Sequence, residues 1–333
     1  MDILNNDFIT YDCIRASVEI TPEEQMSFMV KKGDMLFQRS SETLGDVGRA
    51  NVYMDDKPAV FGGFVIRGKK KTEYNPMFFR YLLASPYARK KIIPMGAGAQ
   101  HFNIGQDGLN KVKLHFPSLL EQKRIATLLQ LIDKRIATQN KIIEDMKKLK
   151  SAIRKKVFTS LKNEHTESRE INQLLAYEHP SAYIVTNDEY SADTTLTPVL
   201  TANKGFVLGY TNEDFGIYQK GECIIFDDFT MDAKYVSFPF KVKSSAIKIL
   251  TAKPNVNLRF MFEYLLYLEL KSEEHKRHYI SEIASLVIEL PSKEKQNRIA
   301  YLMTSLDNKL ALEENIMAGY IAEKRYLLSQ MFI

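Results

Sequence analysis

The sequence has few of the residues that mark secreted, metal-binding and membrane proteins. It contains no tryptophan and two cysteines among 333 residues, and Cys13 and Cys223 lie in different halves. This spacing suggests neither a disulfide framework nor a zinc site. The longest apolar stretch, FMFEYLLYLEL from Phe260, is too short to span a bilayer, and the N-terminus MDILNNDFITYD lacks a secretory signal. The sequence therefore predicts a cytoplasmic protein that contacts no membrane.

Positive charge is unevenly distributed along the chain. The net charge is +5, but the segment from Glu121 to Lys162 alone has twelve Lys and Arg against four Asp and Glu. The rest of the chain is therefore slightly acidic. A basic helix of this kind fits a polyanion that passes along it. Its side chains Lys147, Lys148, Lys150, Arg154, Lys155 and Lys156 could equally face an acidic protein surface or only water.

One segment occurs twice in the chain. A shift of 174 residues aligns Pro117–Phe158 with Pro291–Phe332, and twelve of the 42 aligned positions are identical. Apolar residues at spacings of three, four and seven recur in both copies, which predicts two long helices that each have one apolar face. The first face comprises Ile125, Leu128, Ile132, Ile136, Ile143, Met146, Ile153 and Val157, and the second comprises Ile299, Leu302, Leu306, Leu310, Met317, Tyr320, Leu327 and Met331. Each helix is the natural partner of the other.

The repeat extends upstream of each helix. KKGDMLF from Lys31 matches QKGECIIF from Gln219 as a glycine turn and a strand, and AVFGGFVI parallels VKSSAIKIL as a second strand. NPMFFRYLL parallels LRFMFEYLL as a helix that shares Tyr-Leu-Leu, and LNKVKLHFP and IASLVIELP predict a last strand before each proline. The predicted fold class is α+β, with two mixed α/β domains in tandem, each followed by a long helix.

With this arrangement the chain resembles the specificity subunits of type I restriction-modification systems. The motif that carries the resemblance is EQKRIA…LLQLIDKRI at Glu121–Ile136, with a second copy, KQNRIA…MTSLDNKL, at Lys295–Leu310. EHPSAYIV, TPVLTANKGFVLGYTNE and IIFDDFT in the second half are similar to one class of recognition domain. The resemblance covers essentially the whole chain. It implies that the two long helices pack as an antiparallel coiled coil.

The resemblance also implies domain boundaries. They are a first target-recognition domain over 1–116, a central spacer helix over 117–158, a linker over 159–170, a second recognition domain over 171–290 and a C-terminal spacer helix over 291–333. The lysine-glycine turn follows 49 residues in the second domain and only 31 in the first. We therefore expect the first domain to be shortened at its N-terminus relative to the family.

The function that the resemblance implies is non-catalytic. Such a subunit binds no cofactor itself, reads a bipartite target in double-stranded DNA and recruits two modification (methyltransferase) subunits, to which restriction (translocase) subunits add. A competing hypothesis is a scaffold or recombination fragment that binds the modification subunit without reading DNA. A self-sufficient nuclease or methyltransferase is disfavoured, because the sequence shows no cofactor or metal motif.

Two motifs have an enzymatic interpretation that a simpler one outweighs. NPMF at Asn75–Phe78 is similar to the motif with which adenine methyltransferases hold a flipped base, but asparagine as N-cap and proline in the first turn explain the same residues. FDDFTMDAK places three aspartates within a short segment, whereas nuclease carboxylates usually come from separate strands. A strand that runs into an exposed loop is the preferred interpretation.

DNA contacts are expected in loops at the edges of the predicted sheets, because binding residues gather there. In the first half they lie in QRSSETLGDVGR and in GAGAQHFNI, where Gln and Asn can read adenine edges. In the second half they lie in TANKGFVLGYT and FDDFTMDAK. The predicted DNA-binding residues are Arg39, Ser40, Ser41, Arg49, Gln100, His101, Asn103, Lys204, Tyr210, Thr211 and Lys234, with Lys150 and Arg154 of the central helix on DNA phosphate. A plain surface loop, or for Tyr210 a core position, explains these residues as well.

Overall fold

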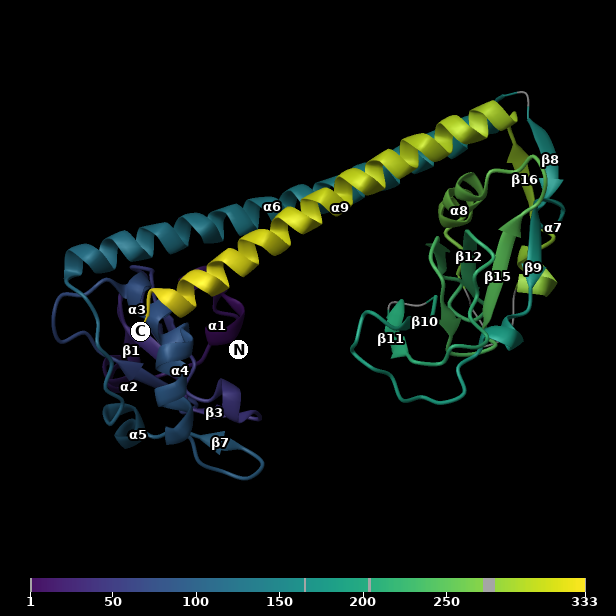
Figure 1. Cartoon of the computed structure of the whole chain (residues 1–333). Helices are drawn as coiled ribbons and strands as arrows, with labels where there is room; N and C mark the ends of the chain where they lie inside the picture. The colour runs from purple at the N-terminus through teal and green to yellow at the C-terminus, as the bar shows by residue number, and fades with distance from the viewer. Residues whose placement is uncertain (1, 165, 203–204, 272–278, 333) are drawn as a thin grey trace. The chain divides into compact units, whose positions relative to one another are not determined.

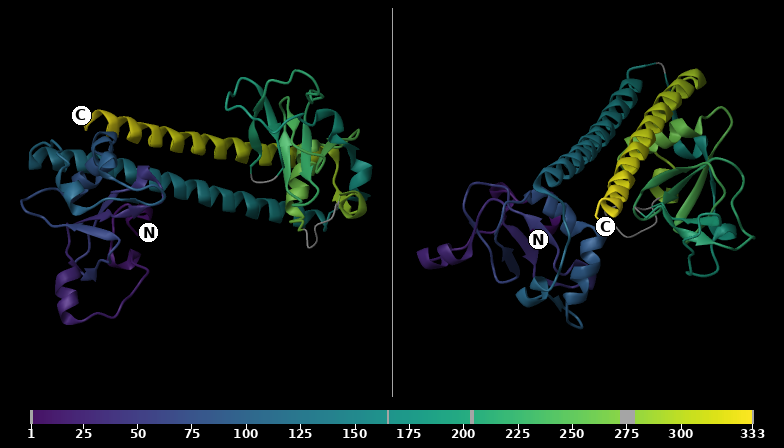
Figure 2. Two further views of the ribbon diagram at one scale, coloured as in Figure 1. Left: turned by 90° about the horizontal axis from the view of Figure 1, so that it is seen from below. Right: turned by 60° about the vertical axis from the view of Figure 1, so that its left-hand side comes forward.

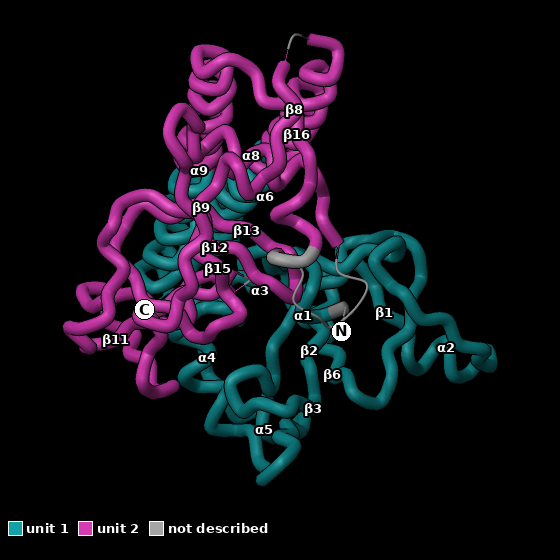
Figure 3. Tube along the Cα trace, turned by 90° about the vertical axis from the view of Figure 1, so that its right-hand side faces the viewer, with its two compact units in different colours: residues 1–142, 314–333 teal, residues 143–313 magenta. Residues whose placement is uncertain are grey.

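A computed structural model describes residues 2–164, 166–202, 205–271 and 279–332. The chain forms two compact units (Figure 3). Unit 1 comprises residues 1–142 and 314–333, and unit 2 comprises residues 143–313. The long helices α6 (Leu119–Leu161) and α9 (Lys293–Gln330) each contribute to both units. Each unit is therefore completed by one end of each long helix.

Unit 1 is built around a three-stranded antiparallel sheet of order β4-β2-β6. Its strands are β4 (Ala50–Val52), β2 (Met35–Gln38) and β6 (Val65–Gly68). Two strand pairs add to it: β1 (Met29–Val30) with β5 (Ala59–Val60), and β3 (Ser40–Ser41) with β7 (Phe102–Asn103). Its helices are α1 (Asp2–Asn5), α2 (Pro22–Phe28), α3 (Pro76–Ala84), α4 (Pro86–Ile92) and α5 (Gln106–Asn110).

Unit 2 has a four-stranded antiparallel sheet of order β13-β12-β15-β9. Its strands are β13 (Ala233–Val236), β12 (Cys223–Asp227), β15 (Ile247–Ala252) and β9 (Leu175–Glu178). A smaller sheet has the order β11-β10-β14, and β16 pairs with β8. The bounds of these elements and of the two helices are β11 (Val207–Thr211), β10 (Thr197–Leu200), β14 (Lys241–Val242), β16 (Val287–Leu290), β8 (Glu167–Glu170), α7 (Ile171–Leu174) and α8 (Leu258–Tyr267).

The two units share a plan but differ at one sheet edge. In unit 2, β9 pairs with the outer edge of β15, and β8 pairs with β16. In the described part of unit 1, no strand pairs with the outer edge of β6. The strand predicted over LNKVKLHFP is wrong, because residues 112–116 form no strand and have no equivalent of β8 beside them. The segment 159–170, predicted as a linker, includes the end of α6 and the whole of β8.

The two long helices pack against each other in opposite directions, as the resemblance implied. In unit 1, Ile125 and Leu129 near the start of α6 share a core with Phe332 at the end of the chain. In unit 2, Phe158 near the end of α6 shares a core with Ile299 and Met303 near the start of α9. The same pairing of a helix start with a helix end therefore occurs in both units. Figures 1 and 2 show α6 in teal and α9 in yellow.

The apolar face is rotated at the start of each long helix. The predicted stripe includes Leu128 and Leu302, but these side chains are 43% and 40% exposed. The next residues, Leu129 and Met303, are fully buried. The reason is that the start of each helix packs on the core of its own unit as well as on the other helix. The repeat itself is unaffected, because both copies are rotated alike.

A glutamine at the start of each long helix joins it to a second helix. Gln122 Oε1 accepts a hydrogen bond from the backbone N–H of Asn75 at 3.0 Å, and Gln296 Oε1 does the same for Asn257 at 2.9 Å. The two asparagines are the N-caps of α3 and α8, and each side chain accepts from the N–H three residues on. The N-cap interpretation of NPMF is thus confirmed. Because the caps correspond, Tyr81 aligns with Glu263, which corrects the Tyr-Leu-Leu alignment by one residue.

No helix within the described ranges has both the length and the apolar character needed to cross a lipid bilayer.

Candidate nucleic-acid interface

Two loops of unit 1 that were selected separately from the sequence lie side by side. Strand β3 pairs with β7, so that Ser40 lies opposite Asn103 and Ser41 lies opposite Phe102. The Ser40 hydroxyl donates a hydrogen bond to the side-chain oxygen of Asn103. The backbone groups of Ala97 and Asn103 exchange hydrogen bonds of 2.8 and 2.9 Å, which close the loop that carries Gln100 and His101. We name Arg39, β3, β7 and this loop the ribbon of unit 1.

The ribbon presents polar side chains to solvent. Arg39, Gln100, His101 and Asn103 are all exposed, and Ser40 and Ser41 are half-buried. Backbone hydrogen bonds of 2.9 Å tie Arg39 to Phe64 on one side and to Ile104 on the other. An amide, an imidazole and a guanidinium on a short hydrogen-bonded support can contact base edges and phosphate. Here the structure brings six of the predicted residues together.

Arg49 lies at the border of this surface. It is exposed, and its Nε forms an ion pair of 2.6 Å with Asp46. The Thr43 hydroxyl, and then Arg49, lower the pKa of Asp46 below its usual value. Arg89 donates hydrogen bonds of 2.9 and 2.6 Å to the carbonyls of Gly45 and Val47, and so holds the same loop from below. Arg49 is thus part of a locally ordered loop, with its positive charge partly balanced.

The predicted residues of unit 2 are less concentrated. Tyr210 is half-buried in β11, opposite Pro198, and Lys234 is half-buried in β13, opposite Ile225, so the two side chains belong to different sheets. Thr211 is 6% exposed, and its hydroxyl accepts a hydrogen bond from the N–H of Glu213. Thr211 is therefore buried beside the Glu213 loop, and its contact with DNA stays a prediction. Lys204 lies outside the described residues.

A buried ion pair orders the loop that follows β11. Lys241 is fully buried, and its Nζ lies 2.5 Å from Glu213, whose side chain is 7% exposed. Glu213 also accepts hydrogen bonds from the hydroxyl and the N–H of Thr186 at 2.6 and 2.9 Å. The bonds from Lys241 and Thr186 lower the pKa of Glu213 from 4.5 to about 2. This carboxylate therefore joins two loops of unit 2 to β14.

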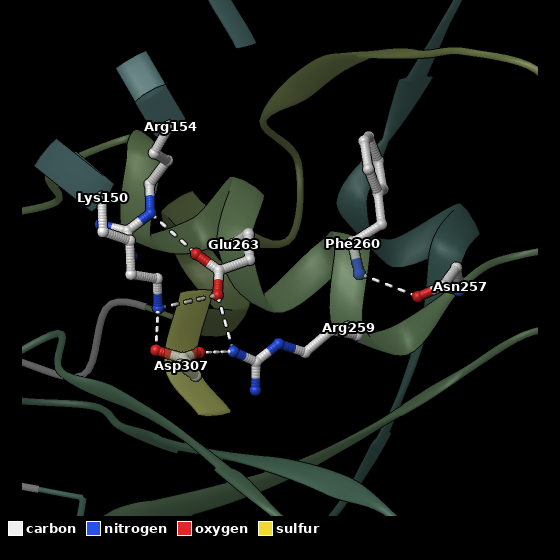
Figure 4. A network of polar contacts seen from close by, with 7 residues as sticks. All are labelled: Lys150, Arg154, Asn257, Arg259, Phe260, Glu263 and Asp307. Carbon is white, nitrogen blue, oxygen red and sulfur yellow. Dashed lines mark hydrogen bonds and ion pairs between the residues drawn. The ribbon is translucent and has the colours of Figure 1, made fainter. Parts of the chain in front are cut away.

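Lys150 and Arg154 are not presented to solvent. Figure 4 shows both side chains directed at acidic groups of unit 2. Arg154 Nε lies 2.8 Å from Glu263 of α8, and Lys150 Nζ lies 2.5 Å from Asp307 of α9 and 3.4 Å from Glu263. Contact with DNA phosphate would require these pairs to break. Lys155 and Lys156 of the same helix are exposed, so we transfer the phosphate-contact prediction to these two residues.

The acidic segment FDDFTMDAK has a structural role. Asp227 accepts hydrogen bonds from the N–H groups of Phe229 and Thr230 in its own turn. Asp228 is 1% exposed and pairs with the buried Lys248 at 3.2 Å. Among the described residues, no group of three or more His, Cys, Asp and Glu side chains is placed to hold a metal ion. These aspartates thus stabilise the fold of unit 2.

The sequence interpretation missed Glu263. In the sequence it stood out only as a charge within an apolar helical segment, FMFEYLLYLEL. The structure places it in α8, fully buried, among Lys150, Arg154 and Arg259. Lys150 and Arg154 stand one turn apart beside the apolar face of α6. These two positive charges next to a buried face were the signal that could have indicated a buried carboxylate such as Glu263.

Comparison with known proteins shows the same duplication, because one family matches each half of the chain. The model of the Type I restriction modification DNA specificity domain matches this chain twice, over residues 2–148 and 163–319. The chain belongs to this family. The homologous specificity subunits are non-catalytic DNA-recognition subunits.

Two curated relatives show how far the similarity extends. The EcoR124I/EcoR124II specificity subunit of Escherichia coli is 41% identical over 165 residues, which is 46% of this chain and 41% of that protein. A putative MjaX specificity subunit of Methanocaldococcus jannaschii is 25% identical over 89% of this chain and 76% of that protein. The match to the Escherichia coli protein thus spans less than half of its length.

Solved structures of the family share the fold. The type I restriction-modification S subunit of M. genitalium has a TM-score of 0.59 at 16% identity, over 92% of this chain and 84% of that one. A chain from a study of complex assembly and conformational transition in a type I system has a TM-score of 0.56 at 13% identity, over 90% and 81%. These likenesses show that two mixed α/β domains with long helices are the fold of this family.

Proposed function

We propose that this protein is the DNA-reading specificity subunit of a type I restriction-modification complex. The observation that carries the proposal is the duplication: the DNA specificity domain model matches both halves. Each half also joins its own α/β domain to a long helix through an equivalent glutamine, Gln122 or Gln296. Two equivalent modules in one chain suit a target with two separate parts.

Each α/β domain would read one part of the target. In unit 1 the ribbon supplies the reading surface, with Gln100 and Asn103 for base edges and Arg39 for a base or phosphate. Tyr210 and Lys234 are the corresponding proposals in unit 2. The α6 and α9 helices would set the gap between the two parts and bind two modification subunits, which the restriction subunits then join.

Phosphate contact would come from the exposed side of α6. Lys155 and Lys156 are exposed, whereas the neighbouring Lys150 and Arg154 are engaged within unit 2. Lysines that only neutralise phosphate add affinity without sequence preference. The α/β domains would therefore read the DNA sequence, and the exposed side of α6 would attract DNA of any sequence.

Co-production of the full chain with the methyltransferase encoded beside it tests this proposal. We expect stable co-elution and adenine methylation at a target of two separated half-sites, read by sequencing of methylated DNA. Substitution of Gln100 and Asn103 by alanine should abolish preference at one half-site and leave the other intact. Co-elution without methylation would instead support the scaffold hypothesis, and activity of the isolated chain would support an enzyme.

A further inference from the structure

The contact between α6 and α9 in unit 1 and the contact between them in unit 2 have one ion pair in common. At the shift of 174 residues, Asp133 and Lys150 of α6 become Asp307 and Lys324 of α9. In unit 1, Lys324 forms an ion pair with Asp133, and in unit 2, Lys150 forms one with Asp307 at 2.5 Å. The same pair is thus made twice, once in each unit.

These ion pairs do not distinguish one helix from the other. Each helix carries both an aspartate and a lysine at the same separation. Two copies of α6 packed in opposite directions would form the same two pairs, and so would two copies of α9, as in a two-fold symmetric interface. The shared pairs therefore favour association without selecting which helices associate.

Two other positions differ between the units. At the same shift, Arg154 of α6 becomes Leu328 of α9. Glu263 and Tyr81 are likewise equivalent, because each stands six residues after the N-cap of its helix, Asn257 of α8 or Asn75 of α3. One unit has an arginine and a glutamate where the other has a leucine and a tyrosine.

The chemistry of the two surfaces follows these differences. In unit 2 the fully buried Glu263 is paired with Arg154 at 2.8 Å, Arg259 at 2.9 Å and Lys150 at 3.4 Å (Figure 4). In unit 1 the Tyr81 hydroxyl donates to Asp133 at 2.6 Å. Leu328 packs against the apolar cluster that contains Tyr81. Unit 2 thus suits a helix with Lys and Arg one turn apart, and unit 1 suits one with Lys and Leu.

We propose that Glu263 selects the helix that completes unit 2. A second copy of α9 in the place of α6 would put Leu328 beside Glu263 and leave a buried carboxylate short of one cation. A second copy of α6 in the place of α9 would put Arg154 beside Tyr81, where Glu263 has no counterpart. Loss of a partner from a buried ion is costly, so each unit accepts the helix of the opposite half over a second copy of its own. The proposal does not depend on DNA binding.

A double-mutant cycle in the full chain tests the selection. R154L gives α6 the residue of α9, and E263Y gives unit 2 the residue of unit 1. Each single change is expected to lower the folding equilibrium constant of unit 2 about 10- to 100-fold, and R154L/E263Y to recover at least tenfold over either single variant. The measurement is urea unfolding, with hydrogen exchange of the backbone amides of α8 as the probe of unit 2. K148L removes an exposed lysine from the same helix that neither proposal uses, and it should leave the unfolding of unit 2 unchanged.

Pairing between copies is a second readout, which a purely structural role would not change. When two differently tagged full chains are co-produced, R154L/E263Y should raise the co-purified fraction severalfold over the wild type. If E263Y does not fold, the reciprocal variant Y81E/L328R decides, because it should be more stable than Y81E or L328R alone. Coupling below about threefold in both cycles, with an unchanged co-purified fraction, would overturn the proposal.

Discussion

Gln296 accepts a hydrogen bond of 2.9 Å from the backbone N–H of Asn257, and its own amide donates one of 2.9 Å to the carbonyl of Pro291. One side chain, 1% exposed, therefore joins the start of α9 to the start of α8. Gln122 makes the same two bonds in unit 1, to Asn75 and Pro117. This repeated contact fixes the angle at which each long helix leaves its α/β domain.

We expect Gln296→Ala to destabilise unit 2 by about 1 to 3 kcal/mol, because it leaves a buried N–H without an acceptor. Gln122→Ala should do the same to unit 1. Chemical unfolding followed by circular dichroism measures both effects. Gln330→Ala, at an exposed position of α9, is the matched control. Equal stability of Q296A and Q330A would show that the contact contributes nothing.

The ion pair of Glu213 makes unit 2 sensitive to acid. Its pKa is lowered from 4.5 to about 2 in the folded chain, so its contribution is complete above about pH 4.5 and is lost as the pH falls toward 2. The contribution is no more than about 3 kcal/mol. Unfolding free energies measured across this range should fall more steeply for the wild type than for E213Q. Parallel pH profiles would contradict this assignment.

Gly98 is expected to be required for the shape of the ribbon. Its φ is +143°, and a Cβ added there would lie 2.0 Å from the carbonyl oxygen of His101. Gly98→Ala should therefore displace Gln100 and His101 and reduce discrimination at one half-site with little loss of global stability. Binding to target and scrambled duplexes measures the effect. Gly105→Ala, where a Cβ would meet nothing within 4 Å, should leave discrimination unchanged.

The exposed lysines of α6 should contribute affinity without preference. We expect K155E/K156E to weaken binding to target and non-target DNA alike and to reduce the slope of log K against log salt by about 1 to 2. Asn103→Ala should instead cost about 1 to 3 kcal/mol of discrimination and leave the slope unchanged. Salt titrations of both variants test this division. A K155E/K156E variant that changed preference as N103A does would contradict it.

Reversal of charge at Lys150 and Arg154 should have a different result from K155E/K156E. In the wild type, Asp307 pairs with Lys150 and Glu263 pairs with Arg154. K150E/R154E removes both cations and places two further carboxylates beside these acidic groups. We expect loss of folded unit 2, seen as early unfolding in urea, before any effect on DNA can be measured. Wild-type stability of this variant would show that both side chains are free to bind phosphate.

The rotated helix face shows what periodicity can predict. Spacings of three and four indicated two long amphipathic helices, but they placed Leu128 on the buried face in place of Leu129. The start of the helix packs on the domain core as well as on the other helix, and the positions of those neighbours are not contained in a local pattern. The strand expected over residues 109–117 was wrong for the same reason, since strand formation there depends on a partner strand.

The sequence alone determined the duplication, the two amphipathic helices and the N-cap at Asn75, because these are local patterns that the backbone satisfies wherever the segment lies. Only the tertiary structure decided which basic residues of α6 face inward. That choice depends on Glu263, a single carboxylate more than a hundred residues away in the sequence. It also joined β3 to β7, whose hydrogen bonds bring the predicted loop residues of unit 1 into one surface.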